Sequence, residues 1–269
     1  MFNQFLTRIF VKKRFFRAYQ YLYAISLKGM GFLNYHNSYV TGEDYVLRLL
    51  SRKSNPLIMD VGAADNFAFV EQILALYPHA EIHAFEPNPE SYKKLIKRHK
   101  SGHIHIYQFG LGQKSGVLSL YDYRGSSATT HASLYKSVLT GIHNTKPVSR
   151  AVKIRTLDRV YKALKLTRPI DFLKIDTEGA ELMVLYGSRN LLKLNKIKLI
   201  QFEFNVMNVY SRVFLKDFFE LLDNYDFYRL LPDGLVSIKS LNPWLYEIFA
   251  FHNILAINKK YNIKPWNLL

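Results

Sequence analysis

The sequence predicts an α/β protein with a doubly wound, mostly parallel sheet, because two patterns alternate along the chain. The first pattern is a set of short apolar runs: LIMDVG (57–62), EIHAFEP (81–87), IHIYQFGLG (104–112), DFLKID (171–176) and LIQFEF (199–204). Such runs are typical of strands buried on both faces. The second pattern is helical periodicity over 66–77, 90–100 and 179–193. Strands alternating with helices predict a parallel sheet covered on both sides.

The length of 269 residues suits one large α/β domain with an addition. We expect a basic, aromatic, helical extension over 1–45 and a domain over 46–269. An insertion at 113–156 breaks the alternation with two strand-like stretches and a polar loop, and such loops are usually functional or disordered. The C-terminal part predicts a helix at 213–224, a turn at 232–234 and a last strand near 248–257.

The charge balance limits the classes of partner. Thirty-seven Lys and Arg against 21 Asp and Glu give a net charge of +16, which favours anionic partners such as lipid headgroups, nucleic acid or an acidic glycan. The chain has no cysteine, which excludes disulfides, a thiolate nucleophile and Cys-ligated zinc, and agrees with a reducing compartment. We therefore expect a cytoplasmic protein.

The N-terminal residues 1–32 combine aromatic and apolar side chains with a set of basic ones: Arg8, Lys12, Lys13, Arg14 and Arg17. No apolar run approaches the ~20 residues that span a bilayer, and no signal-type cleavage site follows. Two alternatives stay open. The segment forms an interfacial helix on the inner face of an anionic membrane, or it docks on the core or on a second subunit of a homo-oligomer.

Polar residues follow the first two predicted strands, where a doubly wound sheet binds ligands. Asp60 ends the first strand, and Gly62 permits a close backbone approach. Glu86 ends the second strand, and an acidic residue there can accept hydrogen bonds from both ribose hydroxyls. The alternative is a surface acid before a helix that begins near Pro87. Together, the Gly62 loop and Glu86 predict a nucleoside pocket.

Five blocks of the chain, in this order and spacing, resemble the FkbM-type family of S-adenosylmethionine-dependent methyltransferases: IMDVGAADNFAFV, IHAFEPNPESY, QFGLGQKSG, VKIRTLDRV and DFLKIDTEGAELMVLYG. The resemblance covers roughly 57–205, and the last block is its most specific part. It implies a class I methyltransferase fold, which is Rossmann-like, with a seven-stranded sheet whose last strand is antiparallel. It also implies S-adenosyl-L-methionine as cofactor and methyl transfer, commonly to a hydroxyl oxygen.

The resemblance also implies roles for individual residues. Asp60, Gly62 and Ala63 would line the methionine part of the cofactor, Glu86 with Pro87 would hold the ribose, Gly110 and Leu111 would lie near the adenine, and Asp176 would face the Gly62 loop. The sequence departs from the family pattern at Ala64, where Asn is usual, and at Asn66, where Gly is usual. Asn can adopt the left-handed conformation that glycine supplies. A non-catalytic member of the family stays an alternative.

The reaction needs an aligned hydroxyl and a group that removes its proton. Asp176 and Glu203 end neighbouring predicted strands, and a carboxylate in a run as apolar as LIQFEF is costly to bury unless it is paired or used. His131, in the insertion, is a third candidate base. Ser126, Ser127 and Glu178 are candidates for contact with the acceptor.

Two nearby features have structural alternatives. Glu178 and Glu181 fall at the start of a predicted helix, where a carboxylate interacts favourably with the helix dipole. For Glu181 a structural role is favoured, and for Glu178 a role as helix cap stays open beside contact with the acceptor. The carboxylates of Asp176 and Glu203 are also the kind of ligands that Mg²⁺ binds, but no spacing requires a metal and we expect none.

The favoured function is O-methylation of a hydroxyl on a sugar, glycan or related small metabolite. One alternative is an RNA methyltransferase, which the cationic and aromatic composition would suit. It ranks lower because no recognised RNA-binding module is visible. The other alternative is a non-catalytic protein that binds a membrane or a partner on the same scaffold.

Overall fold

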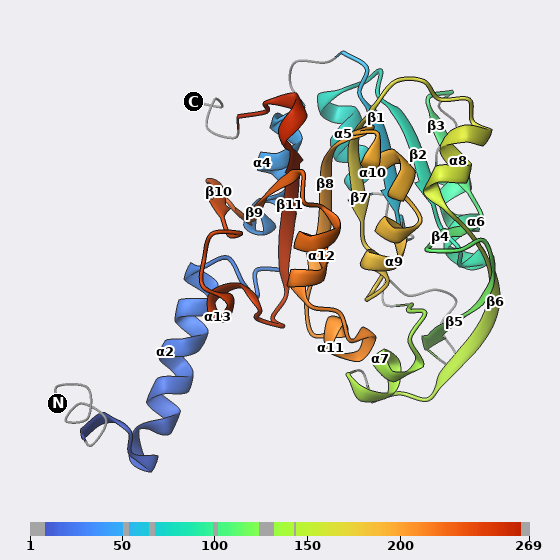
Figure 1. The fold of residues 1–269 in the computed structure, drawn as a ribbon. Helices are drawn as coiled ribbons and strands as arrows, with labels where there is room; N and C mark the ends of the chain where they lie inside the picture. Colours follow the sequence, from blue (N-terminus) through green and yellow to red (C-terminus); the bar gives the residue numbers. More distant parts are fainter. Residues whose placement is uncertain are drawn as a thin grey trace.

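The computed structural model describes residues 9–50, 54–64, 68–98, 102–123, 132–142 and 144–264. Its central sheet contains β1 (Leu57–Val61), β2 (Glu81–Phe85), β3 (Ile104–Tyr107), β7 (Ile170–Ile175), β8 (Ile197–Phe204), β9 (Tyr225–Leu231), β10 (Gly234–Ser237) and β11 (His252–Asn258). The strand order is β10-β9-β11-β8-β7-β1-β2-β3 (Figure 1). The chain order reverses at β1, which has β2 on one side and β7 on the other. Ligands bind at such a switch point.

The strand directions confirm the predicted fold class. Strands β3, β2, β1, β7 and β8 are parallel, and β11 runs antiparallel to β8 and to β9. β11 is the antiparallel last strand that the resemblance implied. The described sheet also contains an eighth strand, β10, which forms an antiparallel pair with β9 across the predicted turn at 232–234.

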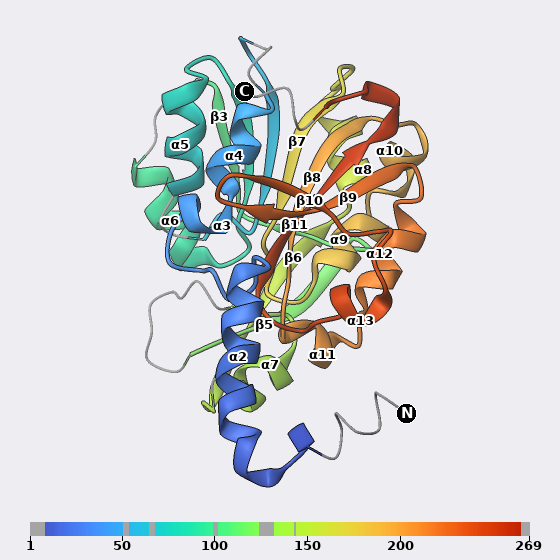
Figure 2. The ribbon, with the colours of Figure 1, turned by 90° about the vertical axis from the view of Figure 1, so that its left-hand side faces the viewer.

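Helices cover both faces of the sheet (Figure 2). The helices are η1 (Lys13–Phe15), α2 (Phe16–Gly29), α3 (Ser38–Thr41), α4 (Glu43–Arg48), α5 (Ala68–Leu76), α6 (Pro89–Arg98), α7 (Lys136–Gly141), α8 (Leu157–Ala163), α9 (Glu181–Tyr186), α10 (Arg189–Lys193), α11 (Met207–Ser211), α12 (Leu215–Leu221), α13 (Pro243–Tyr246) and η2 (Lys259–Tyr261). One apolar cluster joins α4, α5 and α6 to the sheet, and another joins α8, α9, α10 and α12 to its other face. Strand β1 contributes side chains to both clusters, because alternate side chains of a strand point to opposite faces.

Two predicted elements are each divided in the structure, and a glycine lies at or next to each break. The expected strand at 104–112 ends with β3, and its last part forms β4 (Gly110–Leu111) of a second sheet. A Cβ on Gly110 would lie 2.9 Å from Ile154 Cδ1, so glycine allows this close approach. The expected helix at 179–193 divides into α9 and α10 at Gly187, where a Cβ would collide with the carbonyl oxygen of Gly112.

The predicted insertion forms the second sheet, in the order β4-β6-β5, with β5 (Gly116–Tyr123) antiparallel to β6 (Pro147–Arg155). Its helix α7 packs on α11, which follows β8, through Val138, Leu139 and Met207. Figure 1 shows this unit below the ends of the parallel strands. The insertion therefore covers the edge where a site is expected.

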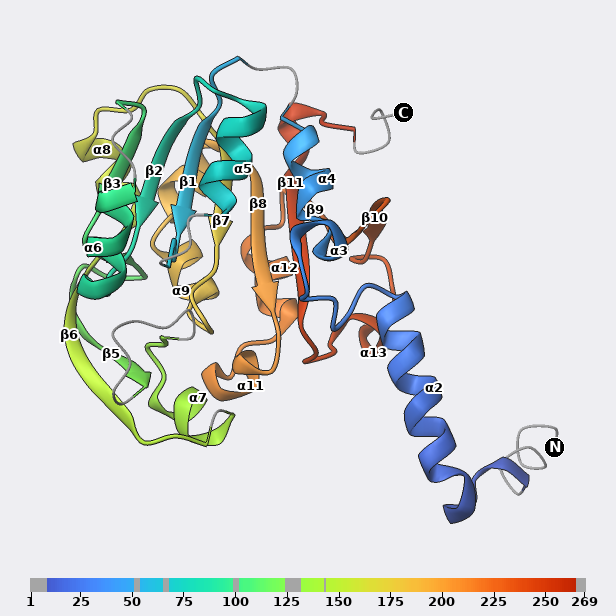
Figure 3. The same cartoon turned by 180° about the vertical axis from the view of Figure 1, so that it is seen from behind.

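In the N-terminal segment, α2 follows η1 and projects from the body of the protein (Figure 3). The expected boundary at residue 45 falls inside α4, whose Val46 and Leu47 are buried in the core. The division at this residue stays a prediction. Among the described helices, none is long and apolar enough to cross a membrane.

Candidate active site

The loop after β1 brings backbone rather than side chains to the edge of the sheet. Gly62 has a φ of +87°, and a Cβ at this position would collide with the carbonyl oxygen of Asp176. Ala64 also has a positive φ, of 52°, which a non-glycine residue adopts at some cost in strain. Its backbone N–H donates to Glu86 Oε2 at 2.9 Å. The non-glycine residue described with a positive φ in this loop is thus Ala64, whereas Asn66 lies outside the described residues.

Glu86 is held in one orientation at the end of β2. Its Oε1 accepts a hydrogen bond from the backbone N–H of Asn88 at 2.6 Å, in addition to the bond from Ala64. The side chain is 6% exposed. The Asn88 side chain donates in turn to Asp122 Oδ2 of β5 at 3.1 Å. These bonds connect the first loop, the second strand and the insertion.

The turn after β7 is shaped by Glu181. Its Oε1 accepts hydrogen bonds, each 3.0 Å long, from Thr177 N, Thr177 Oγ1 and Gly179 N. Burial raises the pKa of Glu181 to about 7, although these bonds oppose the shift. Glu178 then adopts a positive φ of 55°, and its carbonyl accepts from Ser133 Oγ of the insertion at 2.7 Å. Glu181 therefore has the structural role that the sequence favoured.

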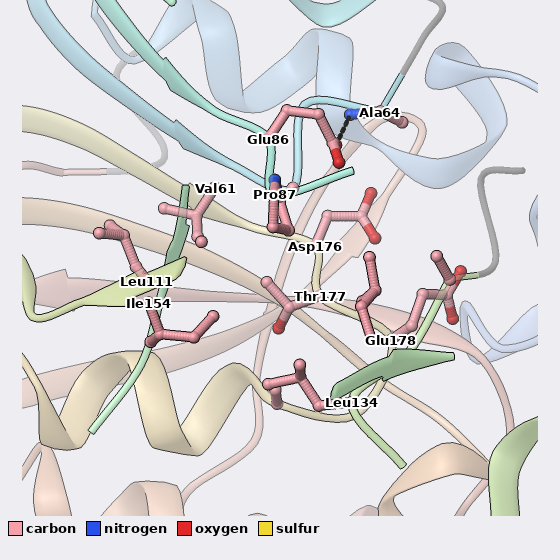
Figure 4. A pocket seen from close by; sticks show the side chains of 15 residues that line it. Val61, Ala64, Glu86, Pro87, Leu111, Leu134, Ile154, Asp176, Thr177 and Glu178 are labelled. Carbon is pink, nitrogen blue, oxygen red and sulfur yellow. Dashed lines mark hydrogen bonds between the residues drawn. The ribbon is translucent and has the colours of Figure 1, made fainter. Parts of the chain in front are cut away.

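A narrow cavity of about 60 Å³ lies between these loops and the insertion (Figure 4). Its polar wall contains Glu86, Asp176 and Glu178, and its apolar wall comes from β4, the insertion and neighbouring segments: Pro87, Leu111, Leu120, Leu134 and Ile154. A carboxylate facing a flat apolar slot is the combination that a nucleoside needs, for its ribose and its base.

A wide cavity of about 530 Å³ adjoins it and shares Gly62, Ala64, Asp176 and Glu178. The N-terminal segment covers it from Tyr35 to Glu43, and Phe69 and Phe251 add aromatic rings. Amide side chains line it as well: Asn37, Gln72, Asn205 and Asn253. Five carboxylates and one ammonium complete the lining: Glu43, Asp60, Asp176, Glu178, Glu203 and Lys174.

Lys174 is the counter-charge for this acidic lining. Its Nζ lies 3.0 Å from Asp176 Oδ2 and 3.9 Å from Glu43 Oε1. Burial alone would lower the pKa of Lys174, but the surrounding carboxylates, Asp176 and Glu43 first, raise it. Lys174 is therefore a fixed positive charge and not a base.

Two carboxyl groups in the wide cavity hold protons more tightly than exposed acids do. Burial raises the pKa of Asp60 to about 6, although Lys174 opposes the shift. Burial, followed by the charges of Asp176 and Glu178, raises the pKa of Glu203 well above its ordinary value. The amide of Asn205 donates to Glu203 Oε2 at 3.3 Å.

The structure brings together all predicted site residues that it describes. Gly62, Glu86, Pro87, Gly110, Leu111, Asp176 and Glu178 line the narrow cavity, and Asp60, Gly62, Ala63, Asp176, Glu178 and Glu203 line the wide one. His131, Ser126 and Ser127 lie outside the described residues. The roles of all these residues stay predictions.

Sequence reasoning missed Lys174 and the N-terminal lining residues. Lys174 had a visible signal, since it is a charged residue within the apolar run DFLKID. Glu43 had no such signal in the sequence. Its position depends on a hydrogen bond from Gln201 Nε2 to Glu43 Oε1, 2.8 Å long, and Gln201 is distant in sequence.

Among the described residues, a group of side chains close enough together to hold a metal ion lies outside the two cavities. The ligand atoms of Glu81, His83 and His105 lie within 4.8 Å of one another. Glu81 opens β2, so this group lies at the amino end of the strand, away from the two cavities. Asp176 and Glu203, the two carboxylates considered for Mg²⁺, both interact with the positive charge of Lys174 instead: Asp176 forms an ion pair with it, and Glu203 lies within its electrostatic influence.

Comparison with known proteins adds a family and several relatives. The family described as Methyltransferase FkbM domain matches residues 60–228, a range that contains every predicted site residue. Methyltransferase 1 of Beauveria bassiana is 25% identical over 124 residues, 41% of this chain and 50% of that protein, so the alignment spans half of the relative's length. Hexuronic acid methyltransferase AglP of Haloferax volcanii is 26% identical over 185 residues, 67% of this chain and 68% of that protein.

Solved structures with similarity include a methyltransferase FkbM from Methylobacillus flagellatus KT, with a TM-score of 0.44 and 12% identity, covering 76% of this chain and 44% of that one. The plantazolicin methyltransferase BpumL in complex with SAH has a TM-score of 0.41 and 12% identity, covering 82% of this chain and 83% of that one.

Proposed function

The chain belongs to the FkbM methyltransferase family, and we propose that it is an S-adenosylmethionine-dependent methyltransferase that acts on a hydroxyl oxygen of an uncharged sugar or related small metabolite. The observation that carries this proposal is the pair of adjoining cavities, which share Gly62, Ala64, Asp176 and Glu178. Transfer between two bound molecules requires them to be held in contact. The shared residues are the place where donor and acceptor would meet.

The residues around the narrow cavity fit the chemistry of the cofactor. Glu86 would accept hydrogen bonds from the ribose hydroxyls, and Leu111, Leu134 and Ile154 would contact the adenine. Glycine at position 62 lets the loop after β1 lie directly against the Asp176 carbonyl, which brings this loop, where the methionine part would bind, next to Asp176. When bound, S-adenosylmethionine supplies an electrophilic methyl group.

The narrow cavity must widen to accept a nucleoside. Its volume of about 60 Å³ is far below the ~300–1,000 Å³ typical of pockets for drug-sized ligands. Leu120 and Leu134 belong to the insertion, whose bond from Ser133 to the Glu178 carbonyl holds it against the β7 turn. We expect cofactor binding to displace this part of the insertion outward.

The protein's own part in the reaction is to orient the acceptor hydroxyl and receive its proton. Asp176 lines both cavities, so its carboxylate is placed to accept that proton. Lys174, 3.0 Å away, fixes the orientation of this carboxylate. Glu203, whose raised pKa favours the protonated form, can donate a hydrogen bond to another acceptor oxygen.

The lining of the wide cavity supports a sugar without a carboxylate. Carboxylates can accept hydrogen bonds from sugar hydroxyls, and amides can both accept from and donate to them. Tyr35, Phe69 and Phe251 offer apolar faces to a ring. The similarity to a hexuronic acid methyltransferase supports a sugar acceptor. A hexuronate, however, would meet several carboxylates, and among the described lining residues the one cation is Lys174, which is already paired with Asp176.

Calorimetric titration with S-adenosylhomocysteine tests the donor site. We expect the wild type to bind and Glu86→Ala to bind roughly 10–100-fold more weakly, because hydrogen bonds to a charged group contribute about 1.5–3 kcal/mol. Asp176→Asn should still bind the product but transfer methyl groups to a reactive sugar about 10²–10⁴-fold more slowly, the usual contribution of a general base.

Glu90→Ala is the matched control. Glu90 is an acid of the next helix that pairs with Lys93 at 3.0 Å and lines neither cavity. Its removal should leave product binding unchanged. A folded wild type that fails to bind S-adenosylhomocysteine would contradict the proposal. Binding without transfer to any sugar would favour a non-catalytic member of the family.

A further inference from the structure

Helix α2 exposes an unusual amount of apolar surface. It projects from the body of the protein in all three ribbon views (Figures 1, 2 and 3). Tyr21 is 74% exposed, Ile25 67% and Leu22 56%. Other large apolar residues of the same segment are exposed as well: Ile9, Phe10, Val11, Phe16, Tyr19 and Tyr23. Exposed apolar surface concentrated on one element is typical of an interaction site.

The same segment is uniformly cationic. Residues 1–42 contain no Asp or Glu, whereas the described part of this range contains Lys12, Lys13, Arg14, Arg17 and Lys28. Arg17 and Lys28 are 11 residues apart, close to three helical turns, so they lie on one face of α2. Phe16, Tyr19 and Tyr23 have the spacing of another face. Leu22 and Ile25 lie between these two faces, so the helix has a basic, an aromatic and an aliphatic side.

The C-terminal end of α2 is fixed to the sheet, so the helix is held in place and is not a free tail. Phe32 is fully buried, with the guanidinium of Arg229 3.8 Å from its ring centroid and the ring of His252 at 4.5 Å. Arg229 Nη1 donates to the carbonyl of Met30 at 3.3 Å, and Leu33 N donates to the carbonyl of Phe251 at 2.8 Å.

We propose that residues 9–29 form a docking surface for an anionic lipid membrane. Aromatic rings would lie at the headgroup level, Leu22 and Ile25 would enter the acyl boundary, and the basic residues would contact anionic headgroups. Nucleic acid would bind the basic residues through its phosphates and stack its bases on the aromatic rings, but the exposed aliphatic side chains would contribute nothing to its binding. A second copy would bring another cationic segment with no carboxylate to pair with it. This inference is independent of the proposed methyl transfer.

Co-sedimentation of the full chain with vesicles tests the surface. We expect binding to vesicles that contain phosphatidylglycerol and little binding to phosphatidylcholine alone. The triple variant Lys13→Glu/Arg14→Glu/Arg17→Glu should partition at least about 100-fold more weakly into anionic vesicles, because each basic residue near the surface contributes about a factor of five. Leu22→Ser/Ile25→Ser should lose at least about tenfold through its apolar contacts.

The matched control reverses three basic residues of α6, Lys94→Glu/Lys97→Glu/Arg98→Glu, which changes the net charge equally on an exposed helix of the domain. This control should retain most of the binding. Equal loss in both triple variants would overturn the proposal, because net charge alone would then explain binding. Failure of the wild type to sediment with anionic vesicles would also overturn the proposal. If, in addition, the wild type forms a dimer that Leu22→Ser/Ile25→Ser dissociates, the surface would be a subunit interface instead.

Discussion

At the scale of the residue, Asp60 links the wide cavity to the stability of the fold. Its side chain is 3% exposed, and its pKa is raised from an ordinary 3.8 to about 6. Between these pH values the folded protein holds a proton that the unfolded chain has released. The contribution of Asp60 to the free energy of unfolding therefore falls as pH rises from about 4 to about 6, by roughly 3 kcal/mol in total, and then levels.

Asp60→Asn should remove this fall, since an amide does not ionise. We expect the free energy of unfolding of the variant, relative to wild type, to be higher at pH 7 than at pH 4 by up to roughly 3 kcal/mol. Urea unfolding at the two pH values measures this. Asp223→Asn, at an exposed position, is the control and should behave as wild type. The same difference between Asp60→Asn and wild type at both pH values would contradict the expectation.

Residues whose position follows from the local sequence pattern were predictable from the sequence. Gly62 and Glu86 directly follow apolar strands, so their place at the sheet edge followed from the strands alone. Glu43 and Lys174 meet only because the N-terminal segment folds over the end of β7. The sequence contains no local signal for such a contact, which depends on tertiary packing.

At the scale of the element, strands and helices were predictable where burial on both faces sets their pattern, as in β1, β2, β7 and β8. The sequence pattern was wrong in treating 104–112 as one strand and 179–193 as one helix. Near each break a glycine lies close to another part of the chain, Gly110 to Ile154 and Gly187 to the Gly112 carbonyl, and such contacts depend on tertiary packing.

The junction between α2 and the sheet offers a test at this scale. Phe32→Ala would leave a cavity beside the buried Arg229 and His252, and we expect it to lower the free energy of unfolding by roughly 3–5 kcal/mol. Phe16→Ala, the same substitution at a position 63% exposed, should change it by less than about 0.5 kcal/mol. Denaturant unfolding of both variants measures the contrast, and equal effects would mean that Phe32 does not anchor the segment.

At the scale of the whole molecule, the sign of charge differs between the protein and its wide cavity. The chain has a net charge of +16, yet the described lining of the cavity has five acidic side chains and one ammonium, and of the acids only Glu203 strongly favours its protonated form. A long-range field of this sign attracts anions and speeds their encounter, mainly at low salt. Inside the cavity the lining carboxylates repel them, and like charges held in contact cost several kcal/mol. Local repulsion should therefore decide which acceptor reacts.

Glucose and glucuronate differ in one carboxylate, so the rates of methyl transfer to the two sugars show whether long-range attraction or local repulsion decides which acceptor reacts. We expect kcat/KM for glucuronate to be at least about tenfold lower than for glucose. Glu43→Gln should narrow the ratio, because it removes a lining carboxylate and leaves Lys174 with fewer counter-charges. Glu90→Gln, outside the cavity, should leave the ratio unchanged. Faster transfer to glucuronate would instead show that Lys174 exchanges Asp176 for the sugar carboxylate, and the acceptor would then be acidic.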